Sequence, residues 1–202
     1  MNPLRLQRGL SLIEVLISFA ISGILLGAAV PSFQDWVRST QTRNQTESIQ
    51  AGLNKARTEA LHRNTRVTFW LVSNPEVKSL GNNCVTSDKG DAWVVSLNDP
   101  SNKCAALPSD SSDPLLIAKH AAGDGSTNTT VNALPADAVA VTFNGLGQVS
   151  TTASGGDAIT QIDISHKQVQ DNDRSYRLTI SAGGQVKMCD PQVTSLSDSR
   201  KC

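Results

Sequence analysis

A long apolar run near the N-terminus constrains this chain more than any other feature. After a short basic leader that ends at Gly9, residues 10–30 are mostly apolar, and the run stops at Pro31. A helix rises about 1.5 Å per residue, so this run is long enough to cross a hydrocarbon core of about 30 Å. Glu14 is the one charged residue within it. A carboxylate inside an apolar helix costs about 2.5–3.5 kcal/mol on insertion scales, so Glu14 needs a partner or a function.

Three ordinary explanations fit this segment less well. A secretory signal peptide has an apolar middle of about 7–15 residues followed by a small-residue cleavage site. Here the run is longer, and Pro31 directly follows the small residues at its end. A plain membrane anchor leaves Glu14 unexplained. A buried core helix does not explain why Arg5 and Arg8 stand just before a surface that is apolar all round.

The segment Arg8-Gly9-Leu10-Ser11-Leu12-Ile13-Glu14 resembles the class III signal of type IV pilins and type II secretion pseudopilins. That family has a glycine, a hydrophobic first mature residue and then Leu-Ile-Glu. Here Leu10 replaces the usual Phe, and Pro31 stands where the family commonly has a helix-kinking proline. The resemblance implies that a prepilin peptidase cuts after Gly9 and methylates the new amine of Leu10. It also implies that Glu14 pairs with the N-terminal ammonium of a neighbouring subunit, which offsets the burial cost on assembly.

The chain is expected to be α+β, with a long N-terminal helix packed on an antiparallel, two-sheet β domain. Pro31 should bend this helix rather than end it, because a proline removes one backbone donor. The expected parts are a cleaved leader, a transmembrane and assembly helix, an amphipathic helix and a β-rich globular domain, over residues 1–9, 10–31, 32–63 and 64–202, respectively.

The second half of the helix carries one apolar stripe. Its members recur at spacings of four and three, and they are Ile49, Leu53, Ala56 and Ala60. Polar residues surround this stripe, so the helix is amphipathic here. The stripe therefore requires the domain that follows to cover it.

The remaining chain reads as short strands separated by polar loops. The expected strands are residues 66–73, 92–97, 115–119, 139–143, 148–151, 159–165, 176–181 and 185–189. Two late hairpins have glycine turns, at Asn144-Gly145 and at residues 182–184. These hairpins, the second ending in Cys189-Asp190-Pro191, resemble the GspH/FimT subgroup of minor pilins and pseudopilins, which includes FimU-like members.

Four cysteines in a chain with an export signal favour disulfides. Four cysteines allow three pairings. The sequence-local pairs, Cys84–Cys104 and Cys189–Cys202, are preferred because each closes a short loop, worth about 3 kcal/mol in the chain-entropy model. A zinc site is disfavoured because the chain has no C-x-x-C and its histidines are scattered.

No catalytic constellation stands out, so the chain is not expected to be an enzyme or to hold a cofactor or metal. Its histidines, His62, His120 and His166, lie far apart and read as surface residues. The loop acids Asp88, Asp91, Asp110 and Asp113 read as solvated rather than as calcium ligands. The group Arg57, Arg63 and Arg66 reads as a solvated helix end.

Charge gives little support to a nucleic-acid partner. Lys and Arg number 18, as do Asp and Glu, and loss of the basic leader makes the mature chain slightly acidic. Some FimT-type relatives are pilus-borne DNA receptors with a Gly-Arg-x-Arg motif, and the corresponding stretch here is Gly184-Gln185-Val186-Lys187. Gln185 cannot neutralise a phosphate, and Lys187 lacks the planar fork of arginine. DNA is therefore a minor alternative partner.

The resemblance implies a minor pilin, a structural subunit that helps prime or cap a type IV pilus for pilus assembly and twitching motility. An H-type minor pseudopilin of type II secretion and a DNA receptor for natural transformation remain open alternatives. The implied partners are prepilin peptidase, other minor and major pilins or pseudopilins, and the inner membrane. The implied location is the bacterial inner membrane, in a single pass with the N-terminus cytoplasmic, and then a cell-surface or periplasmic filament.

Overall fold

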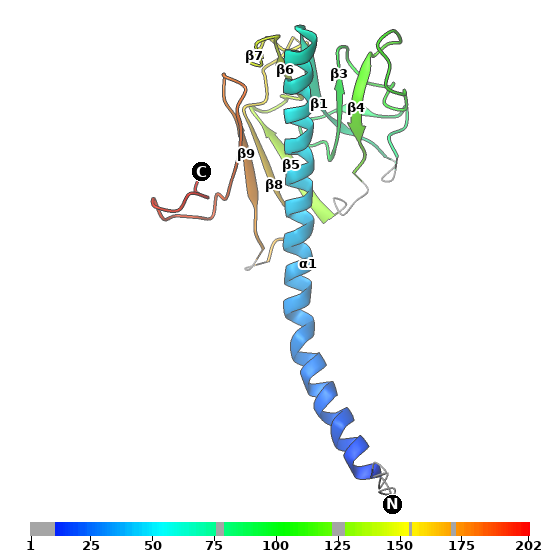
Figure 1. The fold of residues 1–202 in the computed structure, drawn as a ribbon, viewed down its shortest axis with the longest axis vertical. Helices are drawn as coiled ribbons and strands as arrows, with labels where there is room; N and C mark the ends of the chain where they lie inside the picture. Colours follow the sequence, from blue (N-terminus) through cyan, green and yellow to red (C-terminus); the bar gives the residue numbers. More distant parts are fainter. Residues whose placement is uncertain (1–10, 76–78, 123–127, 154, 171–172) are drawn as a thin grey trace, which may run out of the picture. The chain divides into compact units, whose positions relative to one another are not determined.

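A single long helix opens the described part of the chain. The computed structural model describes residues 11–75, 79–122, 128–153, 155–170 and 173–202. Helix α1 spans Leu12–Arg63 and continues through Pro31, so the proline does not end the helix, as the sequence predicts (Figure 1). The chain divides into two compact units, one ending at Val37 and the other comprising Arg38–Cys202. Each unit is described by itself below.

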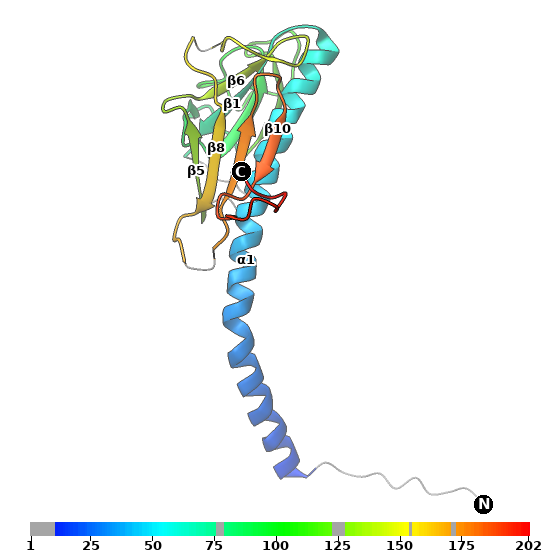
Figure 2. The ribbon, with the colours of Figure 1, turned by 90° about the vertical axis from the view of Figure 1, so that its left-hand side faces the viewer.

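The second unit holds two antiparallel sheets (Figures 1 and 2). The first has the order β4-β3-β1-β6-β7, with β2 also paired to β1, and the second has the order β10-β9-β8-β5. The predicted α+β class, a helix on antiparallel sheets, is confirmed. The strands are β1 (Val67–Ser73), β2 (Val85–Thr86), β3 (Ala92–Ser96), β4 (Leu116–His120), β5 (Thr129–Leu134), β6 (Ala140–Phe143), β7 (Val149–Ser150), β8 (Gln161–His166), β9 (Tyr176–Ile180) and β10 (Val186–Cys189).

The predicted apolar stripe of α1 lies in the main core. All four of its residues are fully buried: Ile49, Leu53, Ala56 and Ala60. Gly52 lies beside the stripe, where an added β-carbon would come within 2.8 Å of the rings of Phe69 and Trp93. The glycine therefore lets the helix approach β1 and β3 closely.

The buried face of α1 also includes polar residues that the apolar stripe did not predict. Thr42, Gln45 and Thr46 are buried. Thr46 Oγ1 donates to the carbonyl of Thr42 at 2.8 Å, and Gln45 Nε2 donates to the carbonyl of Asp91 at 2.7 Å. Because these side chains have hydrogen-bond partners, their burial is tolerated.

In the first sheet, the strands β1, β3 and β6 are buried on both faces. Phe69 and Leu71 of β1 belong to the core shared with α1, whereas Trp70 and Val72 belong to a second apolar cluster. Successive side chains of a strand point to opposite faces, so the two clusters cover the two sides of β1. The second cluster includes side chains from the long segment that contains Cys84 and Cys104.

The second sheet includes a strand that the sequence analysis missed. β5 pairs with β8 in continuous antiparallel register from Thr129–His166 to Leu134–Gln161. Along β5 the burial alternates, with Val131 and Ala133 in the core. The segment is rich in Thr, Asn and Ala, and its two inward apolar side chains give a weak strand pattern. The two-residue strand β2 was also missed.

The two glycine hairpins form as predicted, but the turn of the first differs from the predicted Asn-Gly type. In the first, Gly147 rather than Asn144 or Gly145 has a positive φ, of 72°, and Gly147 N–H donates to the carbonyl of Asn144. In the second, Gly184 has a φ of 77° and donates to the carbonyl of Ser181. Each loop is a turn closed by a left-handed glycine, a common form of longer hairpin connection.

The two hairpin turns meet each other and the helix at Arg57. Arg57 Nε donates to the carbonyl of Gly147 at 3.1 Å, and Arg57 Nη2 lies 3.5 Å from the carbonyl of Gly183. Val149 N–H donates to the carbonyl of Ala182 at 3.0 Å, which joins the two hairpins directly. Arg57 is therefore not a solvated helix end, because it joins α1 to one turn from each sheet. We call the contact of Arg57, Gly147 and Gly184 the turn junction.

Two disulfides tie down the irregular segments. Cys84 is bonded to Cys104, across 20 residues, and Cys189 to Cys202, across 13. The first lies fully inside the second apolar cluster. The second returns the C-terminal tail to the end of β10, where Asp190 N–H also donates to the carbonyl of Arg200 at 2.7 Å.

Candidate functional site

Helix α1 begins with a capped first turn that contains Glu14. Ser11 precedes the helix, and its Oγ accepts a hydrogen bond from the backbone N–H of Glu14 at 3.3 Å. Ser11 followed three residues later by Glu14 has the sequence of a capping box. This role of Ser11 is not among the predictions above, although the S-x-x-E spacing indicates it. The cap residue therefore lies three residues before the carboxylate, and the helix starts at Leu12.

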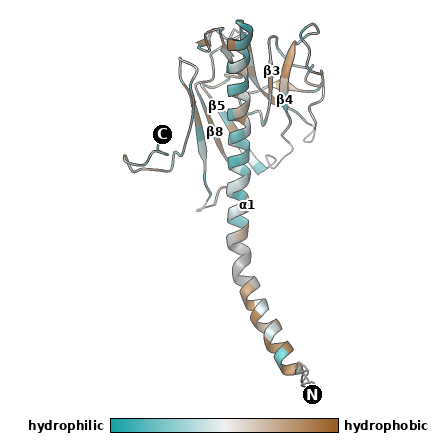
Figure 3. Ribbon diagram, viewed as in Figure 1, coloured by the Kyte–Doolittle hydropathy of each residue, from teal (hydrophilic) through white to brown (hydrophobic). Residues whose placement is uncertain are grey.

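The first part of α1 exposes apolar side chains in every direction. The large exposed ones are Leu12, Ile13, Val15, Leu16, Ile17, Phe19, Ile21, Ile24 and Leu25. Figure 3 shows this segment in hydrophobic colours, interrupted near its start. An exposed apolar surface of this extent requires a lipid or protein cover. Within the part of the chain that the structure describes, no helix meets the combined requirement of length and apolarity for crossing a membrane.

Glu14 is part of a polar stripe on this apolar helix. Glu14, Ser18 and Ser22 follow one another at four-residue spacing, which places them on one face. Together with Val15 and Phe19 they line a shallow groove of about 250 Å³. Ser18 Oγ donates to the carbonyl of Glu14 at 2.7 Å, so the hydroxyl is satisfied within its own helix. The sequence prediction concerns Glu14 alone and does not include this stripe.

The helix itself compensates only part of the cost of Glu14. A carboxylate in the first turn interacts favourably with the helix dipole by about 0.3–1 kcal/mol. This is smaller than the insertion cost of about 2.5–3.5 kcal/mol. Glu14 is exposed, with no ion pair to any other described residue. Its partner must therefore come from outside these residues if the segment is buried.

The structure gives little or no description of three other residues predicted to act in processing or assembly. Gly9 and Leu10, the predicted processing pair, lie outside the described residues. For Pro31 the structure gives the helical backbone only. Their predicted roles in processing and assembly therefore stay predictions.

The three histidines do not form a site, and one differs from its predicted position. His62 is exposed, and His120 stacks on Trp93 with ring centroids 5.7 Å apart. His166 is buried, with Nδ1 3.2 Å from Nη2 of Arg38, so the prediction of a surface residue was wrong. Among the described residues, no cluster of His, Cys, Asp or Glu has the composition of a metal site.

His166 belongs to a buried ionic network. Arg38 forms a two-pronged ion pair with Asp173, through Nε at 3.0 Å and Nη2 at 2.9 Å. Arg38 also donates to the carbonyl of Gln168. The side chain of Asp173 is only 7% exposed, so this pair joins α1 to the loop between β8 and β9 in a largely desolvated setting.

Three of the loop acids and Arg63 are more engaged than predicted. Asp113 pairs with Lys103, which holds the pKa of the Asp113 carboxyl below its ordinary value. Arg63 binds both Glu59 and Asp110. Asp91 is half-buried, and burial raises the pKa of its carboxyl. These contacts are structural: Arg63 neutralises the two carboxylates that it binds, and the described residues contain no acidic cluster with the composition of a metal site.

Residues 184–187, the stretch compared with a DNA-binding motif, form the end of a hairpin turn and the start of β10. Gly184 closes the second hairpin, and Gln185 N–H donates to Ser181 Oγ at 3.2 Å. Val186 and Lys187 begin β10, with Lys187 opposite Thr179 of β9. The stretch therefore has a structural role in the hairpin.

Two family models match the chain. A model described as "Type II transport protein GspH" matches residues 45–184, which is more than half of the chain. A model described as "Prokaryotic N-terminal methylation motif" matches residues 4–30. This motif implies processing by a prepilin peptidase and assembly with pilins.

Two curated relatives match a short part of the chain. They are the type IV major alpha-pilin and fimbrial protein Q, both of Moraxella bovis. Each is 41% identical over 46 residues, which is 23% of this chain. The match spans 29% of the length of each relative.

Among solved structures, the chain is similar to the type IV minor pilin FimU of Pseudomonas aeruginosa in two crystal forms. The TM-scores are 0.44 and 0.41, at 16% identity in both cases. The first comparison covers 77% of this chain and 96% of FimU, and the second covers 76% and 99%.

Proposed function

Because the chain belongs to the GspH family of type IV pilin-like proteins, we propose that it is a minor pilin. In this proposal it is a low-copy structural subunit that helps prime or cap a type IV pilus for pilus assembly and twitching motility. The pilin family is structural rather than enzymatic. One observation carries the proposal: the capped start of α1 places Glu14 on a polar stripe within an exposed apolar surface.

The proposed mechanism is assembly driven by pairing of Glu14. Family members are membrane-anchored first and then enter a pilus or a periplasmic filament. Residues 10–31 form the span, with the N-terminus cytoplasmic, and cleavage after Gly9 leaves a methylated amine on Leu10. That amine on one subunit pairs with Glu14 of the next. An unassembled subunit carries an unpaired carboxylate, and a correctly docked one does not, so Glu14 selects the register of docking.

The polar stripe extends this role along the helix. Ser18 and Ser22 lie on the same face as Glu14, so the face directed at the neighbouring subunit is polar over two turns. Hydroxyl groups at helix contacts in an apolar medium add hydrogen bonds, and their small size allows close approach. The remaining faces of the segment meet lipid before assembly and other apolar helices afterwards.

Substitution of Glu14 tests the assembly role. Glu14→Ala and Glu14→Gln should insert into the membrane normally but enter the filament poorly, measured as the fraction of subunit in sheared filaments against the membrane fraction. Glu47→Ala is the matched control, because Glu47 is an exposed glutamate of the same helix with an ion pair to Arg43. Normal incorporation of Glu14→Ala would refute the pairing role. A Gly9→Trp variant should keep its leader, which a gel detects as a larger chain.

A minor pseudopilin of type II secretion is the second candidate, favoured by the description of the matching family model. The two functions share their N-terminal machinery, so processing assays do not separate them. Deletion of the gene does: loss of pili and twitching with intact protein secretion supports the pilin. The reverse result supports the pseudopilin. A salt-dependent gel shift with residues 32–202 tests the third candidate, a DNA receptor, which the absence of a shift at low salt would exclude.

A further inference from the structure

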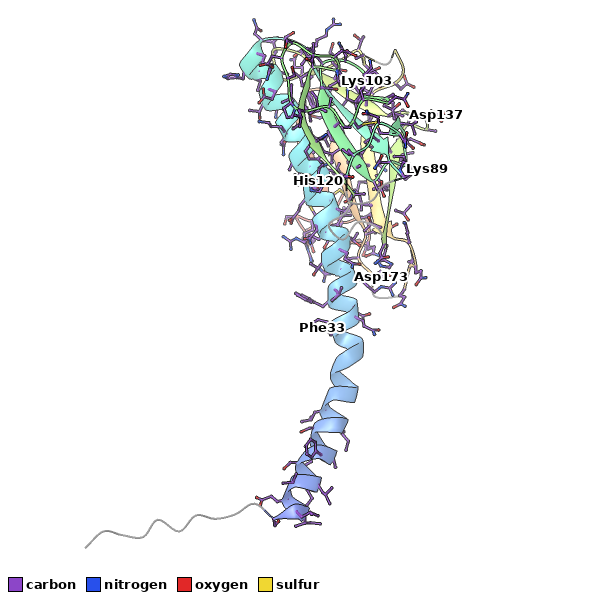
Figure 4. All side chains as sticks on the ribbon, turned by 90° about the vertical axis from the view of Figure 1, so that its right-hand side faces the viewer. Phe33, Lys89, Lys103, His120, Asp137 and Asp173 are labelled. Atoms are coloured by element: carbon purple, nitrogen blue, oxygen red, sulfur yellow. A yellow bond between two sulfur atoms is a disulfide. The ribbon has the colours of Figure 1, made fainter. Side chains whose placement is uncertain are left out.

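Two exposed aromatic side chains lie on the first compact unit. Phe33 and Trp36 are three residues apart on α1, and their ring centroids are 5.9 Å apart. Each side chain is 63% exposed, and Figure 4 shows Phe33 projecting from the helix. Of the three tryptophans, Trp70 and Trp93 are buried, so Trp36 is the exposed one.

The pair stands at the end of an uncharged segment of α1. Residues 15–34 contain no charged side chain, and Glu14 and Asp35 bound this segment. At about 1.5 Å per residue its length is about 30 Å, which equals the thickness of a hydrocarbon core. Phe33 lies within the last turn of the segment, and Trp36 directly follows Asp35. When residue 14 lies near one surface of the hydrocarbon core, the aromatic pair therefore lies near the other surface.

The chemistry of the pair suits that level. Tryptophan has an apolar ring and a polar N–H, so it prefers a site with one apolar side and one wet side. Asp35, between the two aromatic residues in sequence, requires water or headgroups rather than hydrocarbon. The second compact unit begins at Arg38, two residues after Trp36. The side chain of Arg38 forms an ion pair with Asp173 of the same unit. The change from apolar to charged residues thus occurs within a single turn of the helix.

We propose that Phe33 and Trp36 form an interfacial anchor that binds the headgroup region of the lipid bilayer on the side of residues 38–202. This inference rests on the proposed membrane span of residues 10–31. The anchor acts before assembly and resists sliding of the helix along the membrane normal. It thereby holds Glu14 at a fixed depth, where the amine of an incoming subunit can reach it.

Tryptophan fluorescence tests this anchor directly. The full-length protein is reconstituted in phosphatidylcholine vesicles, and vesicle flotation first measures whether it is membrane-bound. The emission of Trp36 is obtained by subtracting the spectrum of a Trp36→Phe variant, in which Trp70 and Trp93 remain. Lipids with bromine near the headgroup and lipids with bromine near the chain end then quench this emission according to depth. The variant changes a residue outside the second unit, and an unchanged far-ultraviolet circular dichroism spectrum verifies its fold.

The anchor predicts that Trp36 emission moves to shorter wavelength in vesicles and is quenched more strongly by shallow bromine than by deep bromine. Stronger quenching by deep bromine, or emission like that of water-exposed tryptophan, would overturn the anchor while leaving the membrane span in place. Failure of the protein to float with vesicles would overturn the span and the anchor together. The measurement is repeated at decreasing protein-to-lipid ratio. Quenching that persists supports lipid contact, whereas a shift that disappears on dilution would assign the aromatic surface to another copy of the chain.

Discussion

Replacing Gly184 by alanine tests the turn junction that holds the two sheets and α1 together. Gly184 has a φ of 77°, and a β-carbon there would overlap the carbonyl oxygen of Gly147. That carbonyl accepts the hydrogen bond from Arg57 Nε. The alanine methyl group must therefore push the two turns apart, which removes this bond and the neighbouring one between Val149 and Ala182.

The expected loss is large for a change of one methyl group. The left-handed conformation costs a non-glycine residue about 1–2 kcal/mol. Loss of a hydrogen bond to a charged donor costs about 1.5–3 kcal/mol, and loss of a neutral one about 0.5–1.5 kcal/mol. Gly184→Ala should thus lower the free energy of unfolding by about 3–6 kcal/mol.

Two other glycines separate the conformational cost from the contact. Gly155 has nearly the same φ, 73°, but among the described residues beyond its chain neighbours no atom lies within 4 Å of an added β-carbon, so Gly155→Ala should cost only about 1–2 kcal/mol. At Gly183 the φ is not left-handed, and the nearest atom is Ser181 Oγ at 3.8 Å, an ordinary contact. Gly183→Ala should therefore be close to neutral.

Urea unfolding followed by tryptophan fluorescence measures these differences. Trp70 and Trp93 are buried in the two clusters on either side of the first sheet, so both report loss of the domain. The slope with urea must stay the same for the free energies to be comparable. If Gly184→Ala costs no more than Gly155→Ala, the turn junction contributes nothing and the reasoning is wrong.

Three further changes test the core, a half-buried carboxyl and a disulfide. Leu53→Ala should lower the free energy of unfolding by about 2–5 kcal/mol, because Leu53 is fully buried. Leu196→Ala, at an 89% exposed site, should change it by no more than about 0.5 kcal/mol. Equal urea midpoints for the two variants would contradict this prediction. Burial raises the pKa of Asp91 above its ordinary 3.8, so its ionisation destabilises the fold as the pH rises through the interval between these two values. Asp91→Asn should therefore be more stable than the parent at pH 7, and this advantage should disappear when the pH is well below 3.8. A stability difference that does not change with pH would show that ionisation of Asp91 is not its cause. Replacing Cys84 and Cys104 together by serine should cost about 3 kcal/mol from loop entropy, and adding a reductant to this variant should lower its stability less than it lowers that of the parent.

The features that local pattern determines were predictable from the sequence. The stripe from Ile49 to Ala60 repeats with the period of a helix, so its buried face follows directly. The strand β1 is rich in β-branched and aromatic residues, which fit a pleated buried surface. Prediction and structure agree in these two elements because the same local pattern extends over many consecutive residues.

Features that depend on a distant partner were not predictable. The strand β5 has a weak pattern of its own and exists because β8 offers a complete antiparallel register. His166 looks like a polar strand end in sequence, yet Arg38, which is 128 residues away, makes its burial acceptable. In both cases tertiary contacts override a local preference.

The candidate site likewise has local features that the sequence predicts and a distant partner that it does not. The charge of Glu14, its apolar surroundings and the basic leader are local, so they are visible in the sequence, and their resemblance to the pilin signal implies an assembly segment. The capping role of Ser11 is local too, and attention to the S-x-x-E spacing could have predicted it. The partner of Glu14 is different, because no ion pair within the described residues involves it. A single chain can specify the demand for such a partner but not its identity.

The two glycine turns show why even a correct local prediction can miss the physical role of a residue. Residues 144–147 and 181–184 form similar turns, and each sequence predicts a hairpin. What distinguishes Gly147 and Gly184 from Gly155 is that their turns contact each other and Arg57. A glycine required only for its φ tolerates a neighbouring methyl group, whereas a glycine at a backbone contact does not. The need for glycine at the turn junction therefore arises from the joining of the two sheets, and it should be lost in any variant whose hairpins are already separated.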